Sequence, residues 1–166
     1  RPISRVQFVF GKFLGLAGVL TLNWLFLSLT ELLLYSSLGG LPKSVTFVAL
    51  ALLALQAFVL AAFAVFFSSF TTTSISVMLV IGIFLIGTNV EPLRQVIQKQ
   101  SDGTMKGVLT MATDLIPNLG HFNLGFLVTY GLEPEKGFLS RGILYALVWI
   151  VPLVFLTGRL LDRREA

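Results

Sequence analysis

Four long apolar stretches constrain the fold of this chain more than any other feature of its sequence. They cover residues 13–38, 45–67, 74–90 and 142–158. Within the first stretch Glu31 is the only charged side chain, and the second stretch has none. A helix needs about 20 apolar residues to cross the roughly 30 Å hydrocarbon core of a bilayer, because its backbone groups must be paired without water. The four stretches therefore predict membrane-spanning helices.

The composition agrees with a membrane location and disagrees with a soluble domain. Hydrophobic residues make up 55% of the chain and charged residues 12%, whereas soluble domains carry roughly 25% charged residues. With 166 residues there is room for one membrane domain, residues 1–166, and none for a separate catalytic domain. The absence of cysteine excludes disulfides and thiolate metal sites.

The positive charges lie where membrane topology places them. The net charge is +4. Arg1, Arg5 and Lys12 precede the first apolar stretch, and Arg159, Arg163 and Arg164 follow the last. The positive-inside rule then puts both ends in the cytoplasm, which four crossings permit. Because topology accounts for the basic residues, no nucleic-acid partner is expected.

The polar segment at residues 91–141 is expected outside the membrane, on the extracytoplasmic face. Residues 92–100 alternate apolar and polar side chains with a helical period, which predicts a helix lying on the surface. Residues 108–130 are too apolar for an ordinary loop and are interrupted by Pro117 and Gly120, which predicts short interfacial or re-entrant helices. The expected fold class is an all-α polytopic membrane protein with four transmembrane helices and short helices before the last of them.

Three polar residues inside the spans are candidates for a polar pathway: Ser28, Glu31 and Gln56. A charged side chain at the centre of a membrane helix costs roughly 2.5 to 3.5 kcal/mol on insertion scales, so Glu31 invites a functional interpretation. The alternative is structural, because Glu31 lies in the outer third of its helix and Gln56 can hydrogen-bond a neighbouring helix. The sequence leaves both interpretations open.

Small residues repeat at helical spacing in the second span, at Ala54, Ala57, Ala61 and Ala64. Such a stripe lets another helix approach closely, so it predicts helix packing and marks a candidate dimer seam. His121 is the sole histidine, and its candidate metal-binding companions are Asp114 and Asn123. One imidazole with scattered oxygen ligands is a weak metal site, so no metal is predicted, and His121 is expected to hold the break at Pro117.

Two motifs resemble a known family. Residues 116–125, Ile-Pro-Asn-Leu-Gly-His-Phe-Asn-Leu-Gly, resemble the stretch before the last helix in ABC exporter permeases of the second type, particularly the copper-enzyme maturation and gliding-motility permeases. Residues 1–12, Arg-Pro-Ile-Ser-Arg-x-x-Phe-x-x-Gly-Lys, resemble the cytoplasmic segment after the second transmembrane helix of that family. The order and spacing match across essentially the whole chain.

The resemblance implies a transporter subunit and not an enzyme. The family has six helices, so this chain corresponds to helices three to six, and we expect residues to precede it. The resemblance also implies a bacterial inner membrane, a homodimer or pseudo-dimer of permeases, and a cytoplasmic ATPase partner. No Gly-x-x-x-x-Gly-Lys-Ser/Thr motif is present, so ATP and Mg²⁺ would bind the partner and this chain would carry no cofactor.

Residues 1–12 would be the cytoplasmic segment that couples the permease to its ATPase, with Arg1, Pro2, Ser4 and Arg5 as contacts. Pro2 suits a helix start and the arginines can pair with carboxylates on the partner. Basic clusters beside spans also bind lipid phosphates, so an anchoring role is an equal alternative.

Two other functions remain to be weighed. A membrane anchor or scaffold subunit of a larger complex would need neither coupling contacts nor a polar face. An intramembrane enzyme is disfavoured, because no His-Glu-x-x-His motif, Ser-His pair or paired intramembrane carboxylate occurs. The substrate is not encoded in a motif: a lipid, a peptide, an ion complex and force transmission to an extracytoplasmic partner all fit.

Overall fold

The computed structural model describes residues 5–99 and 104–163, and over these residues every regular element is helical. The elements are α1 (Arg5–Ser37), α2 (Ser44–Ser68), α3 (Thr73–Thr88), α4 (Val90–Gln98), α5 (Thr104–Asp114), the 3₁₀ helix η1 (Leu119–Phe122), α6 (Gly125–Tyr130) and α7 (Phe138–Arg163). The prediction of an all-α fold is confirmed.

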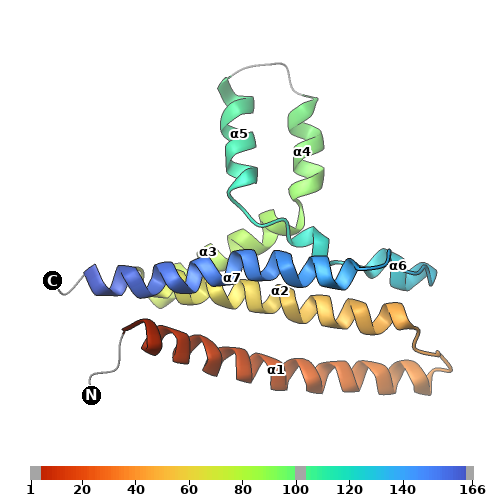
Figure 1. Cartoon of the computed structure of the whole chain (residues 1–166). Coiled ribbons are helices and arrows are strands. Elements are labelled where there is room, and N and C mark those ends of the chain that lie inside the picture. The colour runs from red at the N-terminus through yellow and green to blue at the C-terminus, as the bar shows by residue number, and fades with distance from the viewer. Residues whose placement is uncertain (1–4, 100–103, 164–166) are drawn as a thin grey trace.

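The long helices form a bundle from which a helical hairpin projects (Figure 1). Helices α1, α2 and α7 lie lengthwise beside one another, and the start of α1 and the end of α7 are at the same end of the bundle. Helix α3 runs back from that end and is followed, after a bend of 63°, by α4. Helices α4 and α5 pair with each other and project from the side of the bundle.

Three helices are long and apolar enough to cross a membrane: α1, α2 and α7. A fourth crossing results if α3 and α4, with the bend between them, count as one broken span. Helix α3 has 16 residues and a length of about 24 Å, which is less than the roughly 30 Å hydrocarbon core. The structure therefore has the character of an all-α membrane protein, and α3 by itself is shorter than the three candidate spans.

Several element boundaries differ from those expected. The first helix begins at Arg5, so residues 5–12 form the first turns of α1, and the last helix covers Phe138–Arg163 where residues 142–158 were expected. The surface helix predicted at residues 92–100 begins at Val90, directly after α3, and Gln100 lies outside the described residues. The helix extends over residues 5–12 because a helix propagates until a residue or contact stops it, and these residues contain no proline.

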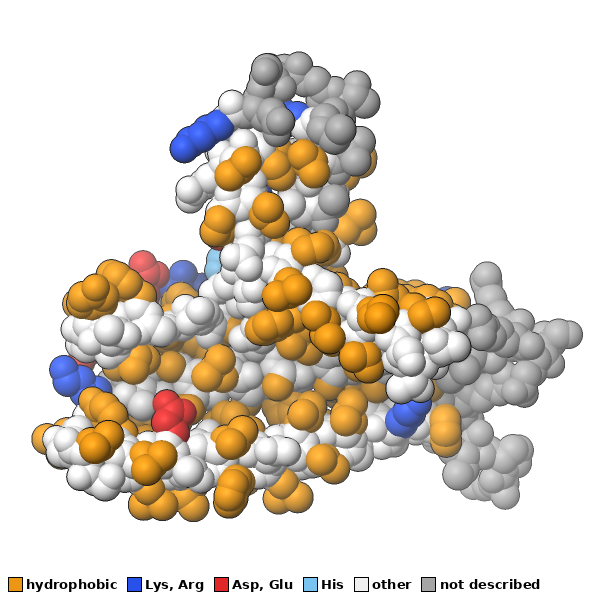
Figure 2. All heavy atoms as spheres, turned by 180° about the vertical axis from the view of Figure 1, so that it is seen from behind, with side chains coloured by type: hydrophobic (Ala, Val, Ile, Leu, Met, Phe, Trp, Pro, Cys, Tyr) orange, Lys and Arg blue, Asp and Glu red, His pale blue; other side chains and the backbone are white. Residues whose placement is uncertain are grey.

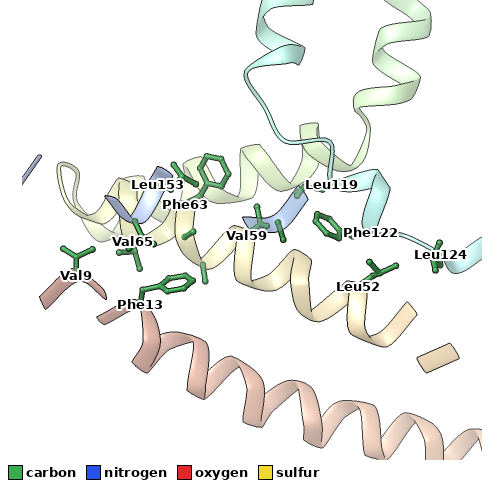
Figure 3. Close-up of a cluster of buried hydrophobic side chains, with 14 residues drawn as sticks. Val9, Phe13, Leu52, Val59, Phe63, Val65, Leu119, Phe122, Leu124 and Leu153 are labelled. Atoms are coloured by element: carbon green, nitrogen blue, oxygen red, sulfur yellow. The ribbon is translucent and has the colours of Figure 1, made fainter. Parts of the chain in front are cut away.

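Helix α2 is the centre of the bundle and contacts α1, α3, α6, α7 and η1. Its buried side chains include Leu52, Val59 and Phe63, which pack with Leu119 and Phe122 of η1 (Figure 3). On the α1 side, the Trp24 indole N–H donates a 2.8 Å hydrogen bond to the Leu50 carbonyl oxygen. The core thus lies around α2, where the sequence carries no charged residue.

The outer surface of the bundle is strongly apolar. Figure 2 shows hydrophobic side chains spread over the helices, and α1 is exposed over most of its surface. At the turn between α1 and α2, Leu38 is 87% and Leu41 83% exposed. A helix that is hydrophobic all round is either buried in protein or surrounded by lipid. Since α1 has few protein neighbours here, its surface has the character of one that faces hydrocarbon.

Candidate functional site

The candidate site is a polar cluster where the chain returns from the α4–α5 hairpin to the bundle. Asn118 lies at its centre, with Glu91 of α4, His121 of η1 and Tyr145 of α7 around it. We call these four residues the Asn118 junction. Their elements are far apart in sequence but meet where α3 ends and η1 begins. The cluster combines a carboxylate, an amide, an imidazole and a phenol hydroxyl.

Asn118 is only 7% exposed and is bonded in three directions. Its backbone N–H donates to the Tyr145 hydroxyl oxygen at 2.7 Å, and its side-chain Nδ2 donates to Glu91 Oε1 at 2.7 Å. Its Oδ1 accepts from the Gly120 N–H at 3.1 Å, which shapes the turn into η1. A buried amide with these partners satisfies groups that would otherwise lose their hydrogen bonds to water.

His121 closes the junction on its exposed side. Its Nε2 is 3.4 Å from Asn118 Nδ2 and accepts the second amide hydrogen when that nitrogen is unprotonated. Its ring lies edge-to-face against Tyr145, with 5.7 Å between the ring centroids. The expected role of His121 beside the Pro117 break is thus accompanied by specific contacts to Asn118 and Tyr145.

The junction is tight because the end of α3 touches it directly. A Cβ atom on Gly87 would lie 2.8 Å from the Pro117 carbonyl oxygen and 2.9 Å from the Leu119 side chain. Only glycine lets the two backbones approach this closely. Pro117 and Leu119 are themselves fully buried, so neither has room to move away.

Charged pairs surround the junction on the hairpin and at the start of α7. Arg94 of α4 donates to Asp114 of α5 at 2.7 Å and lies 3.9 Å from Glu91. Arg141 of α7 donates to Glu135 at 2.9 Å. These side chains are 40% to 78% exposed, and exposed ion pairs are worth at most about 1 kcal/mol in water. Their main effect is on position, because the pair of Arg94 and Asp114 holds α4 beside α5.

Two open cavities flank His121. One of about 330 Å³ is lined by Thr88, Glu91, Asn118, Asn123 and Phe126, and the other, of about 340 Å³, by Phe138, Arg141 and Tyr145. Together they offer a carboxylate, a guanidinium, amides and aromatic rings. Over the described part of the chain, no three His, Asp or Glu side chains are grouped closely enough to hold a metal ion.

The three residues of the predicted polar pathway lie at two levels of the bundle. Ser28 and Gln56 are buried and Glu31 is exposed. The hydrogen bond between Trp24 and Leu50 puts these two residues at the same height in the antiparallel pair α1 and α2. Ser28 lies toward one end of the bundle from this height and Gln56 toward the other, so the two are about 15 Å apart along the bundle. The structure therefore does not bring Ser28 and Gln56 together.

The other predicted residues fall on α2 and at the start of the chain. Ala61 is buried and Ala54, Ala57 and Ala64 are half-buried on α2, the helix that contacts most of the others. Of the predicted coupling residues, Arg5 is the first residue of α1. Arg1, Pro2 and Ser4 lie outside the described residues, as does Arg164 of the basic tail.

Sequence reasoning missed three of the four residues of the junction. A signal for Asn118 existed, because asparagine after proline and two residues before glycine is a turn-forming pattern. Glu91 and Tyr145 had no such signal, since each is 27 residues from Asn118 along the chain. Only the three-dimensional arrangement of α4, η1 and α7 brings them together.

Comparison with known proteins identifies no relative. No protein-family model matches the chain, and neither a curated protein nor a solved structure matches it. The family resemblance of residues 1–12 and 116–125 therefore stays a prediction.

Proposed function

We propose that this chain is the transmembrane permease subunit of an ATP-binding cassette exporter, coupling ATP hydrolysis by a separate cytoplasmic ATPase to export or to work outside the membrane. The observation that carries the proposal is the Asn118 junction, a hydrogen-bonded break in an otherwise apolar bundle. At membrane depth, irregular backbone is tolerated where it is buried in protein or lines a water-filled cavity. Broken helices with polar groups at the break are typical of transport proteins.

The proposed topology has four crossings with both ends in the cytoplasm of a bacterial cell. The broken pair α3 and α4 supplies the third crossing, and α5 and α6 belong to the extracytoplasmic half. The start of α1 and the end of α7 lie at the same end of the bundle, as this topology requires. A second permease copy would complete the pathway.

The proposed coupling runs through α1. Its 33 residues form one uninterrupted helix about 50 Å long, beginning at Arg5. A contact with the ATPase at Arg1, Pro2, Ser4 and Arg5 would therefore act on a rigid element that extends the length of the bundle. ATP and Mg²⁺ would be held by the partner, because the sequence has no phosphate-binding loop.

The first experiment is gentle affinity purification of the intact protein from its native membrane, with mass identification and an ATPase assay of what accompanies it. We expect a stoichiometric ATPase with a phosphate-binding loop. Another partner without such an ATPase would contradict the proposal and favour a membrane anchor or scaffold subunit.

A charge reversal at Arg5 tests the coupling contact. We expect Arg5→Glu to weaken co-purification of the ATPase and its stimulation by the permease while membrane insertion is unchanged, because the arginine would pair with carboxylates on the partner. Arg159→Glu is the matched control, since Arg159 lies near the end of α7, with its guanidinium carbon 4.8 Å from the Phe155 ring centre. Equal effects of both changes would indicate anchoring to lipid instead of coupling.

A further inference from the structure

We infer that a cleft between α1, α2 and α3 binds one anionic phospholipid, with its phosphate at the end of the bundle where the chain begins and one acyl chain between the helices. The cleft has a volume of about 390 Å³. Helix α2 forms its floor through Ala64 and Val65, and α1 and α3 form its walls. This inference does not depend on the exporter function.

The lining of the cleft changes from polar to apolar along all three helices. Lys12 of α1, Ser68 of α2, and Thr73 and Ser76 of α3 lie at the mouth, near the end of the bundle. One to two helical turns deeper, the lining residues are Leu16, Ala64, Val80 and Ile81. On each of the three helices, the polar lining residues therefore lie at the mouth of the cleft and the apolar ones lie deeper. A ligand that matches this lining has a polar head and a long apolar tail.

The mouth of the cleft favours a negative charge. Lys12 is exposed there, and no acidic side chain is among the described residues that line the cleft. Helix α3 begins at Thr73 without a side-chain cap and without an acidic residue in its first turn. Its first N–H groups therefore lack helical partners and carry the positive end of the helix dipole.

Two of the hydroxyl groups at the mouth are already engaged. Ser68 donates to the Val65 carbonyl oxygen at 2.9 Å, and the Ser76 hydroxyl is 2.7 Å from that of Thr71. The donors for a phosphate are thus the Lys12 ammonium, the Thr73 hydroxyl and the amides of the first turn of α3. An ammonium beside a helix N-terminus is a combination that binds phosphate groups.

The open side of the cleft explains why the occupant is a membrane lipid. Val77 and Ile81, on the α3 wall, are both exposed, so the cleft opens sideways onto the apolar surface of the bundle. A phospholipid can therefore move sideways from the bilayer into the cleft without passing through water. By the positive-inside rule, the end that carries Lys12 and Arg159 faces the cytoplasm, where anionic lipids provide the negative charge.

The test measures bound lipid on the purified full-length protein by native mass spectrometry, with phosphatidylglycerol and phosphatidylcholine of equal chain length in competition. We expect one phosphatidylglycerol to be retained preferentially. Lys12→Gln should lower its affinity about fivefold, which corresponds to about 1 kcal/mol for one lysine near a charged headgroup. Lys43→Gln, which removes the lysine at the opposite end of the bundle, should leave the affinity unchanged.

A second variant tests the acyl-chain part of the cleft. Ala64→Leu adds three carbon atoms at the floor and should reduce retention of phosphatidylglycerol while Lys12 is intact. Equal retention of the two lipids by the natural protein, or equal loss in Lys12→Gln and Lys43→Gln, would overturn the inference. Thermal stabilisation by inorganic phosphate alone, as large as that by phosphatidylglycerol, would also overturn it, because the acyl chain would then be unnecessary.

Discussion

Gly87 shows how one residue sets the geometry of the candidate site. It is the point at which the end of α3 meets the backbone at Pro117, and the approach leaves no room for a Cβ atom. Gly87 therefore lets the end of α3 pack closely against the returning chain, because it has no side chain. A glycine in a helix is otherwise unfavourable, so its presence at this contact has a physical reason.

We expect Gly87→Ala to destabilise the protein by about 1 to 3 kcal/mol, because the added methyl group meets a carbonyl oxygen at 2.8 Å in a buried contact. Gly82→Ala is the matched control on the same helix. No atom lies within 4 Å of its added Cβ, so it should be neutral or stabilising by up to about 1 kcal/mol. Denaturant unfolding in detergent measures both. Equal stability of the two variants would show that α3 does not touch the junction.

Asn118→Ala should cost about 1 to 3 kcal/mol, because it leaves Glu91 and the Gly120 N–H without their amide partner. Asn123→Ala serves as the control, since Asn123 is exposed and its Oδ1 accepts one bond, from the Gly125 N–H at 2.9 Å. The same unfolding measurement applies. A smaller loss for Asn118→Ala than for Asn123→Ala would contradict the central position of Asn118.

At the scale of residues, local patterns identified part of the site. Pro117 and His121 stood out in the sequence as a break and a lone histidine, and both lie at or beside the junction. Glu91 looked like one acidic residue among several in a polar segment, and Tyr145 like an aromatic residue in a span. Their roles arise from long-range contacts, which hydropathy and spacing do not encode.

At the scale of helices, the long apolar elements and the separation of the third stretch from the helix after it were predictable, and the packing at the break was not. Hydropathy predicted α1, α2 and α7, because each is an apolar helix long enough to span a membrane. The bend between α3 and α4 occurs at Asn89, which is neither proline nor glycine and adopts a φ of −113° and a ψ of 16°. Pro92 has no N–H to bond the Thr88 carbonyl oxygen, and its ring would clash with that oxygen in a continuous helix, so α3 ends at Thr88. The packing of Gly87 against the returning chain then holds this end of α3 in place.

The pairing of α1 with α2 can be tested through one tryptophan. Trp24→Phe removes the hydrogen bond to the Leu50 carbonyl oxygen and should cost about 0.6 to 1.7 kcal/mol, the usual range for bonds between membrane helices. Trp149→Phe is the comparison, because Trp149 packs against Phe63 through its ring, with centroids 5.8 Å apart. We expect Trp24→Phe, and not Trp149→Phe, to increase hydrogen exchange along the outer half of α1.

At the scale of the whole molecule, the order of crossings is directly testable because the chain has no cysteine of its own. The turn after α1 and the link after α2 lie at opposite ends of the bundle. In intact cells, an impermeant maleimide should label Leu41→Cys, whereas Ser69→Cys should react only after the membrane is opened. Labelling of both positions from one side would rule out α2 as a crossing.

The hairpin formed by α4 and α5 leaves the bundle part-way along its length, on the flank away from α1 (Figure 1). A bilayer thick enough to cover α1 therefore reaches the level at which Arg94 and Asp114 lie on the other flank. The two flanks need different surroundings, hydrocarbon around α1 and water or protein beside the hairpin. The molecule consequently has two unlike flanks, and lipid cannot encircle it evenly.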